Sequence, residues 1–271
     1  MGSSDRVVVD ASGRTAVLAK RFGRHEYDSL LLNIAFHAQY EGIPRAVGRR
    51  AGDIRMFTRP DMGWLWLIPL SDTVTSVGAV IPKAVHQREA KATAEESLAH
   101  YLACTPPAGS LLERARRVSP ARVDVDYSYL APRMAGDRWV AVGDAAAFLD
   151  PIFSTGVLLA MQGGLDAAEA IDAGLRTGDV SERAFARYER MVRTRYHHFR
   201  RFAIGFYDPA FRDLRFTPKG AFRIYTAIAP LLAGTWRPSL LTPARPRLFL
   251  ALVAPRPPPP PRQRARPGPG R

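Results

Sequence analysis

The segment that most constrains how this chain can fold is residues 139–163, WVAVGDAAAFLDPIFSTGVLLAMQG. Its first four residues are apolar and predict a short buried strand. The strand pattern ends at Gly143 and Asp144, a loop closed by Pro151 follows, and a helical pattern begins near residues 154–156. In open α/β sheets, ligands bind in the crevice at the carboxyl ends of the strands. The segment therefore predicts an α/β sheet with a ligand site at this point of the chain.

The amino end of the predicted helix favours particular ligands. The first N–H groups of a helix have no partner within it, and the helix dipole is positive at that end. An anion or an electron-rich ring edge would therefore bind near Ser154, Thr155 and Gly156. Asp144 is costly to bury as a bare charge, and sugar-like hydroxyls would supply the donors that it needs. The alternative is an ordinary strand-to-helix turn, in which Asp144 caps the helix and Gly143 eases the corner.

A second segment, residues 63–70, has the sequence GWLWLIPL. Side chains of a strand alternate between two faces, so Trp64, Trp66 and Ile68 share one face of the predicted strand. This face is a wide apolar wall, and the strand ends near Pro69. The usual explanation of such an aromatic stripe is a sheet face packed on a core, and the alternative is the wall of a binding site.

A third segment lies near the start of the chain, where residues 7–14 have the sequence VVVDASGR. The β-branched run predicts a strand that ends at Asp10, and the turn that follows it contains Gly13. Taken alone, this segment predicts only a strand and a turn.

In this order, the three segments resemble motifs of the flavin-dependent halogenases, a family within the FAD-dependent monooxygenases. The resemblance extends from near residue 6 to about residue 250. It implies an α/β (α+β) fold, the C-terminal portion of an FAD/NAD(P)-binding monooxygenase-type fold with an antiparallel substrate-side sheet and C-terminal helices. Four parts are expected. A partial FAD-binding domain is formed by residues 1–28 with 130–180, and the antiparallel sheet with its helices by residues 29–129. A C-terminal helical region follows over residues 181–250, and a disordered Pro/Arg tail over residues 251–271.

The resemblance also implies roles for the residues of the three segments. The tryptophan motif would lie along the tunnel between flavin and substrate, and the amides of Thr155 and Gly156 would contact the halide. Asp144 would bind the ribityl hydroxyls of FAD, and the loop and the helix start would line the pyrimidine edge of the flavin. The tunnel residues are Trp64, Trp66, Ile68 and Pro69, and the cofactor-binding residues are Asp10, Gly13, Gly143, Asp144, Pro151, Ser154, Thr155, Gly156 and Val157.

The activity implied by the resemblance is halogenation of an electron-rich aromatic substrate with reduced FAD, O2 and halide. A separate flavin reductase would supply the reduced FAD. Free-tryptophan halogenases carry a glutamate just before Ser-Thr-Gly, where this chain has Phe153. A phenol- or pyrrole-type substrate is therefore expected, free or bound to a carrier protein. The alternatives are a related flavin hydroxylase, a geranylgeranyl-reductase-like enzyme, and a non-catalytic fragment.

Two features of the family are not found in this sequence. The G-x-G-x-x-G turn that holds the FAD pyrophosphate does not occur. The family's catalytic lysine is expected upstream of Asp10, and none of Lys20, Lys83, Lys91 and Lys219 lies in a matching context, so no catalytic residue is identified. We therefore expect the chain to correspond to the C-terminal portion of a halogenase, either active or inactive alone, with sheet edges exposed where further strands would pair.

Charge and composition argue against several other classes. The net charge is +14, but residues 237–271 hold eight arginines and no acidic residue, so this tail supplies more than half of the charge and no specific nucleic-acid partner is expected. The single cysteine, Cys104, excludes an intrachain disulfide, fits a reducing cytoplasm, and is expected to be a small core residue. No apolar run reaches the roughly 20 residues of a transmembrane helix, and the six histidines show no metal-ligand spacing.

The remaining patterns predict the elements around these segments. Thr93 and Glu96 are a candidate capping box, and the helix that begins near Ser181 is basic and amphipathic. Strands are expected over residues 30–37, 54–59, 63–70, 74–81 and 123–130, and helices over 92–103, 111–117, 155–175 and 181–206, with further helical pieces over 211–236.

Overall fold

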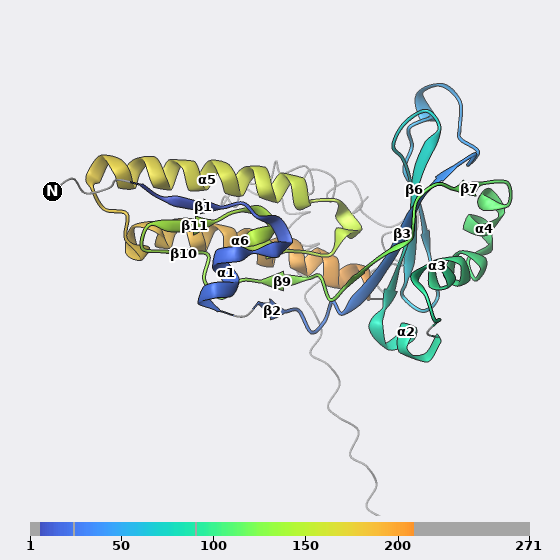
Figure 1. Ribbon diagram of the computed structural model, residues 1–271, viewed down its shortest axis with the longest axis horizontal. Coiled ribbons are helices and arrows are strands. Elements are labelled where there is room, and N and C mark those ends of the chain that lie inside the picture. The colour runs from blue at the N-terminus through green and yellow to red at the C-terminus, as the bar shows by residue number, and fades with distance from the viewer. Residues whose placement is uncertain (1–5, 24, 90, 209–271) are drawn as a thin grey trace, which may run out of the picture.

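The computed structural model describes residues 6–23, 25–89 and 91–208 (Figure 1). Two groups of elements lie side by side along the long axis of the molecule. One group contains the N-terminal strand and the long helices α5 (Gly156–Thr177) and α6 (Glu182–Phe206). The other contains a six-stranded antiparallel sheet with three short helices against one face.

The first group is built on a three-stranded sheet in the order β1-β11-β10. Strand β1 pairs in parallel with β11, and β10 pairs antiparallel with the other edge of β11. A parallel pair needs a long connection, which here contains the whole six-stranded sheet. A second small sheet, in the order β12-β9-β2, adjoins it. The bounds are β1 Val8–Asp10, β2 Glu26–Tyr27, β9 Tyr129–Leu130, β10 Ala135–Gly136, β11 Trp139–Ala141, β12 Ala147–Phe148 and α1 Val17–Phe22.

The second group is an antiparallel sheet in the order β4-β5-β6-β3-β7, with β8 also paired to β3. The strands expected over 54–59, 63–70 and 74–81 all form, and the strand expected over 30–37 begins at Asn33 and runs on to Glu41. The bounds are β3 Asn33–Glu41, β4 Arg55–Thr58, β5 Trp64–Pro69, β6 Val74–Pro82, β7 Arg116–Arg117, β8 Arg122–Val125, α2 Lys83–Glu89, α3 Ala94–Ala103 and α4 Pro106–Leu112.

The two faces of the sheet belong to different hydrophobic clusters. The face under the short helices carries Leu65 and Leu67 of β5, which are buried with Leu98 and Tyr101 of α3. The opposite face carries Trp64, which belongs to the cluster of the first group. Because successive side chains of β5 point to opposite faces of the sheet, this strand packs against both groups of elements.

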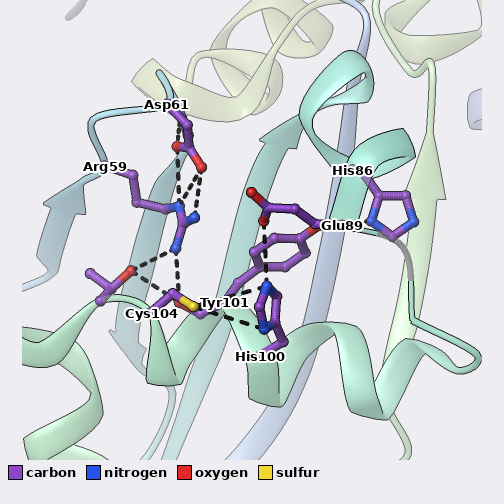
Figure 2. A network of polar contacts seen from close by, with 9 residues as sticks. Arg59, Asp61, His86, Glu89, His100, Tyr101 and Cys104 are labelled. Atoms are coloured by element: carbon purple, nitrogen blue, oxygen red, sulfur yellow. Dashed lines mark hydrogen bonds and ion pairs between the residues drawn. The ribbon is translucent and has the colours of Figure 1, made fainter.

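A polar network closes the helix-covered face (Figure 2). Arg59 is buried, and its guanidinium binds both carboxylate oxygens of Asp61 and donates to the carbonyl of Tyr101 and the hydroxyl of Thr105. Cys104, expected in the core, is exposed at the end of α3 beside His100. The core prediction for Cys104 is wrong because the turn after α3 directs this side chain outward, while Thr105 is buried instead.

Helix ends follow the local signals in most places. Thr93 accepts a hydrogen bond from Glu96 N, so the predicted cap is present, although the Glu96 carboxylate reaches Ala92 N rather than the cap residue's own amide. Ser181 likewise accepts from Ala184 N at the start of α6. Helices α5 and α6 match the predictions over 155–175 and 181–206 closely.

Two element predictions are wrong. The helix expected over 111–117 is instead α4, which begins at Pro106, where proline suits a first helical turn, and residues 116–117 pair with β3. The strand expected over 123–130 is two strands, because Asp126 between them has a left-handed φ of 43°. The helical pieces expected over 211–236 and the tail over 251–271 lie outside the described residues.

Among the described residues, none of the helices is both long and apolar enough to cross a membrane. The same part of the chain contains no group of three or more His, Cys, Asp or Glu side chains arranged to hold a metal ion.

Candidate active site

A cavity of about 370 Å³ lies between the two groups of elements. One side is lined by the sheet face that carries Trp64, Trp66 and Ile68, and the other side is lined by Pro151 and Ser154 from the loop before α5. Two of the three segments singled out in the sequence therefore face each other across one space. The aromatic stripe is the wall of a cavity, and Trp64 in addition packs into a core.

The sheet wall depends on a glycine that sequence analysis missed. Gly78 of β6 lies opposite both Trp66 of β5 and His37 of β3. A Cβ atom at Gly78 would lie 2.2 Å from the Trp66 ring, so only glycine lets the indole lie across β6. The indole Nε1 of Trp66 donates to Ser76 Oγ over 3.1 Å. A glycine inside a strand is a known sign of such a close approach, and it was available in the sequence.

A chain of hydrogen bonds holds the other indole. Trp64 is 3% exposed, and its Nε1 donates to the Tyr207 hydroxyl over 2.9 Å. Tyr207 donates in turn to Asp150 Oδ2 over 2.9 Å, and Asn33 Nδ2 donates to the same oxygen over 2.9 Å. These bonds join β5, the end of α6, the start of β3 and the loop before α5. No local pattern could have predicted Tyr207 or Asn33, because the partners are more than 50 residues away.

Asp150 is the buried centre of this chain of hydrogen bonds, with 2% of its surface exposed. Its Oδ1 accepts from Ile152 N over 3.1 Å and caps the 3₁₀ helix η4 (Pro151–Phe153). Burial raises the pKa of the Asp150 carboxyl to about 6, although the hydrogen bonds from Asn33, Ile152 N and Tyr207 act to lower it. Asp150 therefore fastens the loop to the sheet and keeps Trp64 and the start of α5 in a fixed relation.

The start of α5 presents free backbone donors. Ser154 has a left-handed φ of 53°, and the helix begins at Gly156. Within the described ranges, the N–H groups of Thr155 and Gly156 have no hydrogen-bond partner. A Cβ atom at Gly156 would meet no other atom within 4 Å, so the backbone there is open to an approaching group. Free N–H groups at the positive end of a 22-residue helix favour an anion or a ring-edge acceptor.

A smaller cavity of about 40 Å³ adjoins this helix start and is lined by Gly143, Asp144 and Gly156. Gly143 has a left-handed φ of 57°, and a Cβ atom there would lie 3.1 Å from the Cβ of Ala160 on α5. The Asp144 carboxylate makes no hydrogen bond to any other part of the chain that the structure describes, and its burial raises its pKa. The capping alternative for Asp144 is wrong, because no side chain caps α5.

These features fit FAD as a ligand. A half-buried carboxylate without donors suits the hydroxyls of a ribityl chain, because each hydroxyl would supply a missing hydrogen bond. The open amides at Thr155 and Gly156 suit the electron-rich edge of a flavin or a halide.

The other predicted site residues lie outside both cavities. Asp10 is buried, and its carboxylate accepts hydrogen bonds from Ser12 and from Leu18 N. Burial acts to raise the pKa of Asp10, but these hydrogen bonds outweigh it and lower the pKa. The Asp10 side chain therefore braces its own turn, in which Gly13 has a φ of 63°. Three other predicted site residues also line neither cavity: Pro69 ends β5, Thr155 is buried and Val157 is exposed.

Three polar residues on the cavity wall were not predicted as a site. Asp124 of β8 forms an ion pair with Arg14, which follows β1, and a hydrogen bond with His37 of β3. The His37 Nε2 lies 3.3 Å from Asp124 Oδ2, and all three side chains line the larger cavity. Strand alternation could have placed His37 on the same face as Ala35, but nothing in the sequence pairs it with Asp124, 87 residues later.

Comparison with known proteins gives one consistent family. The family described as tryptophan halogenase matches residues 3–215. The 1H-pyrrole-2-carbonyl-[peptidyl-carrier protein] chlorinase of Pseudomonas fluorescens is 33% identical over 193 residues, which cover 69% of this chain and 43% of the chlorinase. Flavin-dependent halogenase gsfI of Penicillium aethiopicum is 37% identical over 184 residues, covering 65% of this chain and 34% of gsfI. The chain thus spans less than half the length of these relatives.

Solved structures agree with the sequence comparison. The flavin-dependent brominase Bmp2 superposes with a TM-score of 0.79 at 26% identity, over 91% of this chain and 62% of the brominase. The myxobacterial chondrochloren halogenase CndH superposes with a TM-score of 0.68 at 31% identity, over 90% of this chain and 62% of CndH. The fold predicted from the three motifs is therefore confirmed.

Proposed function

The chain belongs to the tryptophan halogenase family, whose members use FAD, and we propose on that premise that it contributes the flavin-facing and substrate-facing walls of a flavin-dependent halogenase. The observation that carries the proposal is the larger cavity, in which the paired indoles face the loop before α5. A sheet face used only for packing would leave no such space beside both motifs.

The residues that would hold FAD lie around the start of α5. Asp144 would accept hydrogen bonds from the ribityl hydroxyls, and Pro151 and Ser154 would lie along the ring edge. When bound, reduced FAD supplies, with oxygen, the oxidising power that converts a halide into an electrophilic halogen. The chain's own part is to hold the halide at the amides of Thr155 and Gly156, where fixed donors replace its water shell. Asp10, Gly13, Gly143 and Val157 stay proposed neighbours of the cofactor through their backbone.

The indole wall would line the passage between flavin and substrate. Trp64 is fixed through Tyr207 and Trp66 through Ser76, so the wall is rigid where an electrophile must pass. A water-poor passage limits loss of the electrophile to solvent. Ile68 continues the lining, and Pro69 ends its strand.

The substrate class proposed is an electron-rich phenol or pyrrole, free or bound to a carrier protein. Phe153, at the position where free-tryptophan halogenases carry glutamate, packs its ring edge-to-face against Phe206 and brings no charge to the loop. The names of two relatives specify a pyrrole carried on a peptidyl-carrier protein. A separate reductase in the same cytoplasmic compartment would supply reduced FAD.

Two exposed apolar surfaces, on β1 and on α5, bear on whether residues 1–271 bind the cofactor firmly. Within the described residues, β1 has one edge unpaired, and its Val8 and Val9 are exposed. Val157, Met161 and Leu165 recur every four residues along α5 and are also exposed. Such faces fit packing against further polypeptide. We therefore expect this chain, purified alone, to retain little FAD after gel filtration. Stoichiometric yellow flavin after that step would contradict the expectation.

The proposed function is tested with FAD in large excess, a flavin reductase with NADH, oxygen, a phenol, and bromide either present or omitted. We expect a brominated product only with bromide. Gly156→Leu fills the open space at the helix start and should lower this yield at least tenfold, whereas Gly164→Leu, on the same helix, should leave it unchanged. A hydroxylated product that forms equally well without bromide would favour a hydroxylase, and flavin binding without any product would favour a non-catalytic fragment.

A further inference from the structure

We propose that His37, oriented by Asp124 and Arg14, recognises the substrate by accepting a hydrogen bond from an O–H or N–H group on a neutral aromatic ring. The inference rests on the proposed function, because it takes the larger cavity to be the substrate site. It adds a substrate-contacting residue, His37, and two positioning residues, Asp124 and Arg14, of which only Arg14 belongs to one of the three sequence segments.

Arg14, His37 and Asp124 form a polar cluster beside an apolar wall of this cavity. Trp64, Trp66 and Ile68 form the apolar part, together with the side chains of Ile54 and Met56. An aromatic ring that enters the cavity would contact this wall through its face, because offset or edge contacts between rings are favourable. Its edge could then carry at most a few polar groups, which must point to the polar side.

His37 occupies the junction between the wall and the polar side. It lies in one cross-strand row with Gly78 and Trp66, and its ring centroid is 6.1 Å from that of Trp66. Gly78 has no side chain to separate them. A ring lying on the Trp66 indole would therefore bring its edge to the His37 imidazole.

The contacts of Asp124 determine which His37 nitrogen can accept a hydrogen bond. A carboxylate can only accept hydrogen bonds, so the neutral imidazole must carry its proton on Nε2, the nitrogen 3.3 Å from Asp124 Oδ2. The other nitrogen, Nδ1, is then an acceptor, and it has no hydrogen-bond partner in the part of the chain that the structure describes. The other oxygen of Asp124 accepts from Arg14 Nη1, which prevents the carboxylate from turning away.

Two other polar residues on this side of the cavity, Ser76 and Asp124, are already engaged. Ser76 Oγ accepts the indole N–H of Trp66, and both oxygens of Asp124 are paired. The guanidinium of Arg14 also lies over the Phe148 ring, 5.4 Å from its centroid. His37 Nδ1 is therefore directed by its surroundings to accept from a ligand. A hydrogen bond of this kind also raises the electron density of a phenol or pyrrole ring, which favours attack on an electrophilic halogen.

The test compares binding of two ligands of similar shape, resorcinol and 1,3-dimethoxybenzene, to the full chain by isothermal titration calorimetry at about pH 8.5. Resorcinol has O–H donors, and its dimethyl ether has only acceptors. We expect the unmodified chain to prefer resorcinol, and we expect His37→Leu to lower the ratio of the two affinities about five- to tenfold, the worth of one hydrogen bond. Comparing ratios between variants cancels the intrinsic difference in hydrophobicity of the two ligands.

Asp124→Asn gives a sharper outcome. Arg14 only donates, so the amide oxygen of the new Asn must face Arg14 and its NH₂ group must face His37 Nε2. Nε2 then accepts and the proton moves to Nδ1, which turns the nitrogen without a protein partner into a donor. We expect this variant to lose the preference for resorcinol and to bind 1,3-dimethoxybenzene better than the unmodified chain does. A loss of structure would weaken both ligands together.

Two further variants complete the test. His37→Gln keeps a donor for Asp124 and an acceptor for the ligand, so it should restore most of the preference that His37→Leu loses. His197→Leu, an exposed histidine on α6, should change neither affinity. The proposal is overturned if the affinity ratio is the same in the unmodified chain, His37→Leu and Asp124→Asn. That result would leave halide-dependent halogenation standing, whereas absence of halogenation with the ratios changed as expected would count against the proposed function alone.

Discussion

The two faces of the six-stranded sheet differ in how their polar groups are satisfied. On the helix-covered face, the guanidinium of Arg59 is hydrogen-bonded to Asp61, Tyr101 and Thr105 (Figure 2). On the cavity face, His37 Nδ1 has no hydrogen-bond partner among the described residues, and the same holds for the first amides of α5 beside the smaller cavity. Polar groups that are hydrogen-bonded within the protein stabilise a fold, whereas polar groups without a protein partner beside a cavity are available to a ligand. Because alternate residues of each strand point to opposite faces, one face of the sheet contributes to stability and the other is available for binding.

The largest expected effect is on the covered face. Leu65 is fully buried in the helix-covered cluster, and Leu65→Ala should lower the free energy of unfolding by about 2–5 kcal/mol through lost contacts and a new cavity. Chemical denaturation measures the change. Leu70→Ala is the matched control, because Leu70 is 54% exposed and its truncation should cost less than about 0.5 kcal/mol. Equal effects of the two substitutions would mean that the covered face does not carry the stability.

The pH dependence of stability tests whether Asp150, on the cavity side of the sheet, is held as a buried carboxyl. Its folded-state pKa of about 6 lies above the ordinary value of 3.8, so its contribution to stability is complete below about pH 4 and is lost as the pH rises through 6. The loss by pH 7 should be about 3 kcal/mol. Asp150→Asn cannot ionise, and the free energy of unfolding of the unmodified chain minus that of the variant should fall by about 2 kcal/mol between pH 4 and pH 7, because part of the loss has already occurred at pH 4. A constant difference would show that Asp150 is not strained by burial.

A substitution at Gly78 tests how the Trp66 indole is packed at the cavity wall. A methyl group at Gly78 would overlap the Trp66 ring, so Gly78→Ala should displace the indole and cost about 1–3 kcal/mol. Thermal unfolding gives the cost, and near-ultraviolet circular dichroism reports the altered indole. Gly52→Ala is the control, because a Cβ atom there meets nothing within 4 Å. If both variants behave like the unmodified chain, the wall is not built on this contact.

The smallest expected effect separates the two indoles. Trp64→Phe removes the hydrogen bond to Tyr207 in a buried setting and should cost about 1 kcal/mol beyond the packing change. Trp66→Phe removes a bond to Ser76 beside the cavity, where water can replace it, and should cost less. Urea denaturation of the two variants, with Tyr207→Phe and Ser76→Ala to complete the double-mutant cycles, isolates each bond. A larger coupling energy for Trp66 than for Trp64 would contradict this order of the two hydrogen bonds.

Much of this fold could be predicted from sequence because it follows local periodicity. Alternation along residues 63–70 placed Trp64 and Trp66 on one face, and helical spacing gave α5 and α6 nearly to the residue. The errors arose where long-range pairing overrides a local pattern. Residues 116–117 extend because they pair with β3, and the run over 123–130 breaks at Asp126, which forms an ion pair with Lys83.

The candidate site could be predicted only where its residues lie in one segment. The loop and helix start over residues 143–157 are contiguous, so their spacing was informative. Asn33 and Tyr207, which fix Asp150, come from elements at opposite ends of the described chain, and His37 meets Asp124 only through the pairing of β3 with β8. No sequence pattern within a segment records such contacts.

The central claim is that the start of α5 and the paired indoles share one site for flavin and halide. The most direct measurement is anomalous diffraction from crystals of this chain grown with FAD and soaked in bromide. We predict a bromide peak within hydrogen-bond distance of the Thr155 and Gly156 amides, with flavin density against that helix start and beside Asp144. Bromide found only at other surfaces, with the helix start covered by protein, would contradict the account.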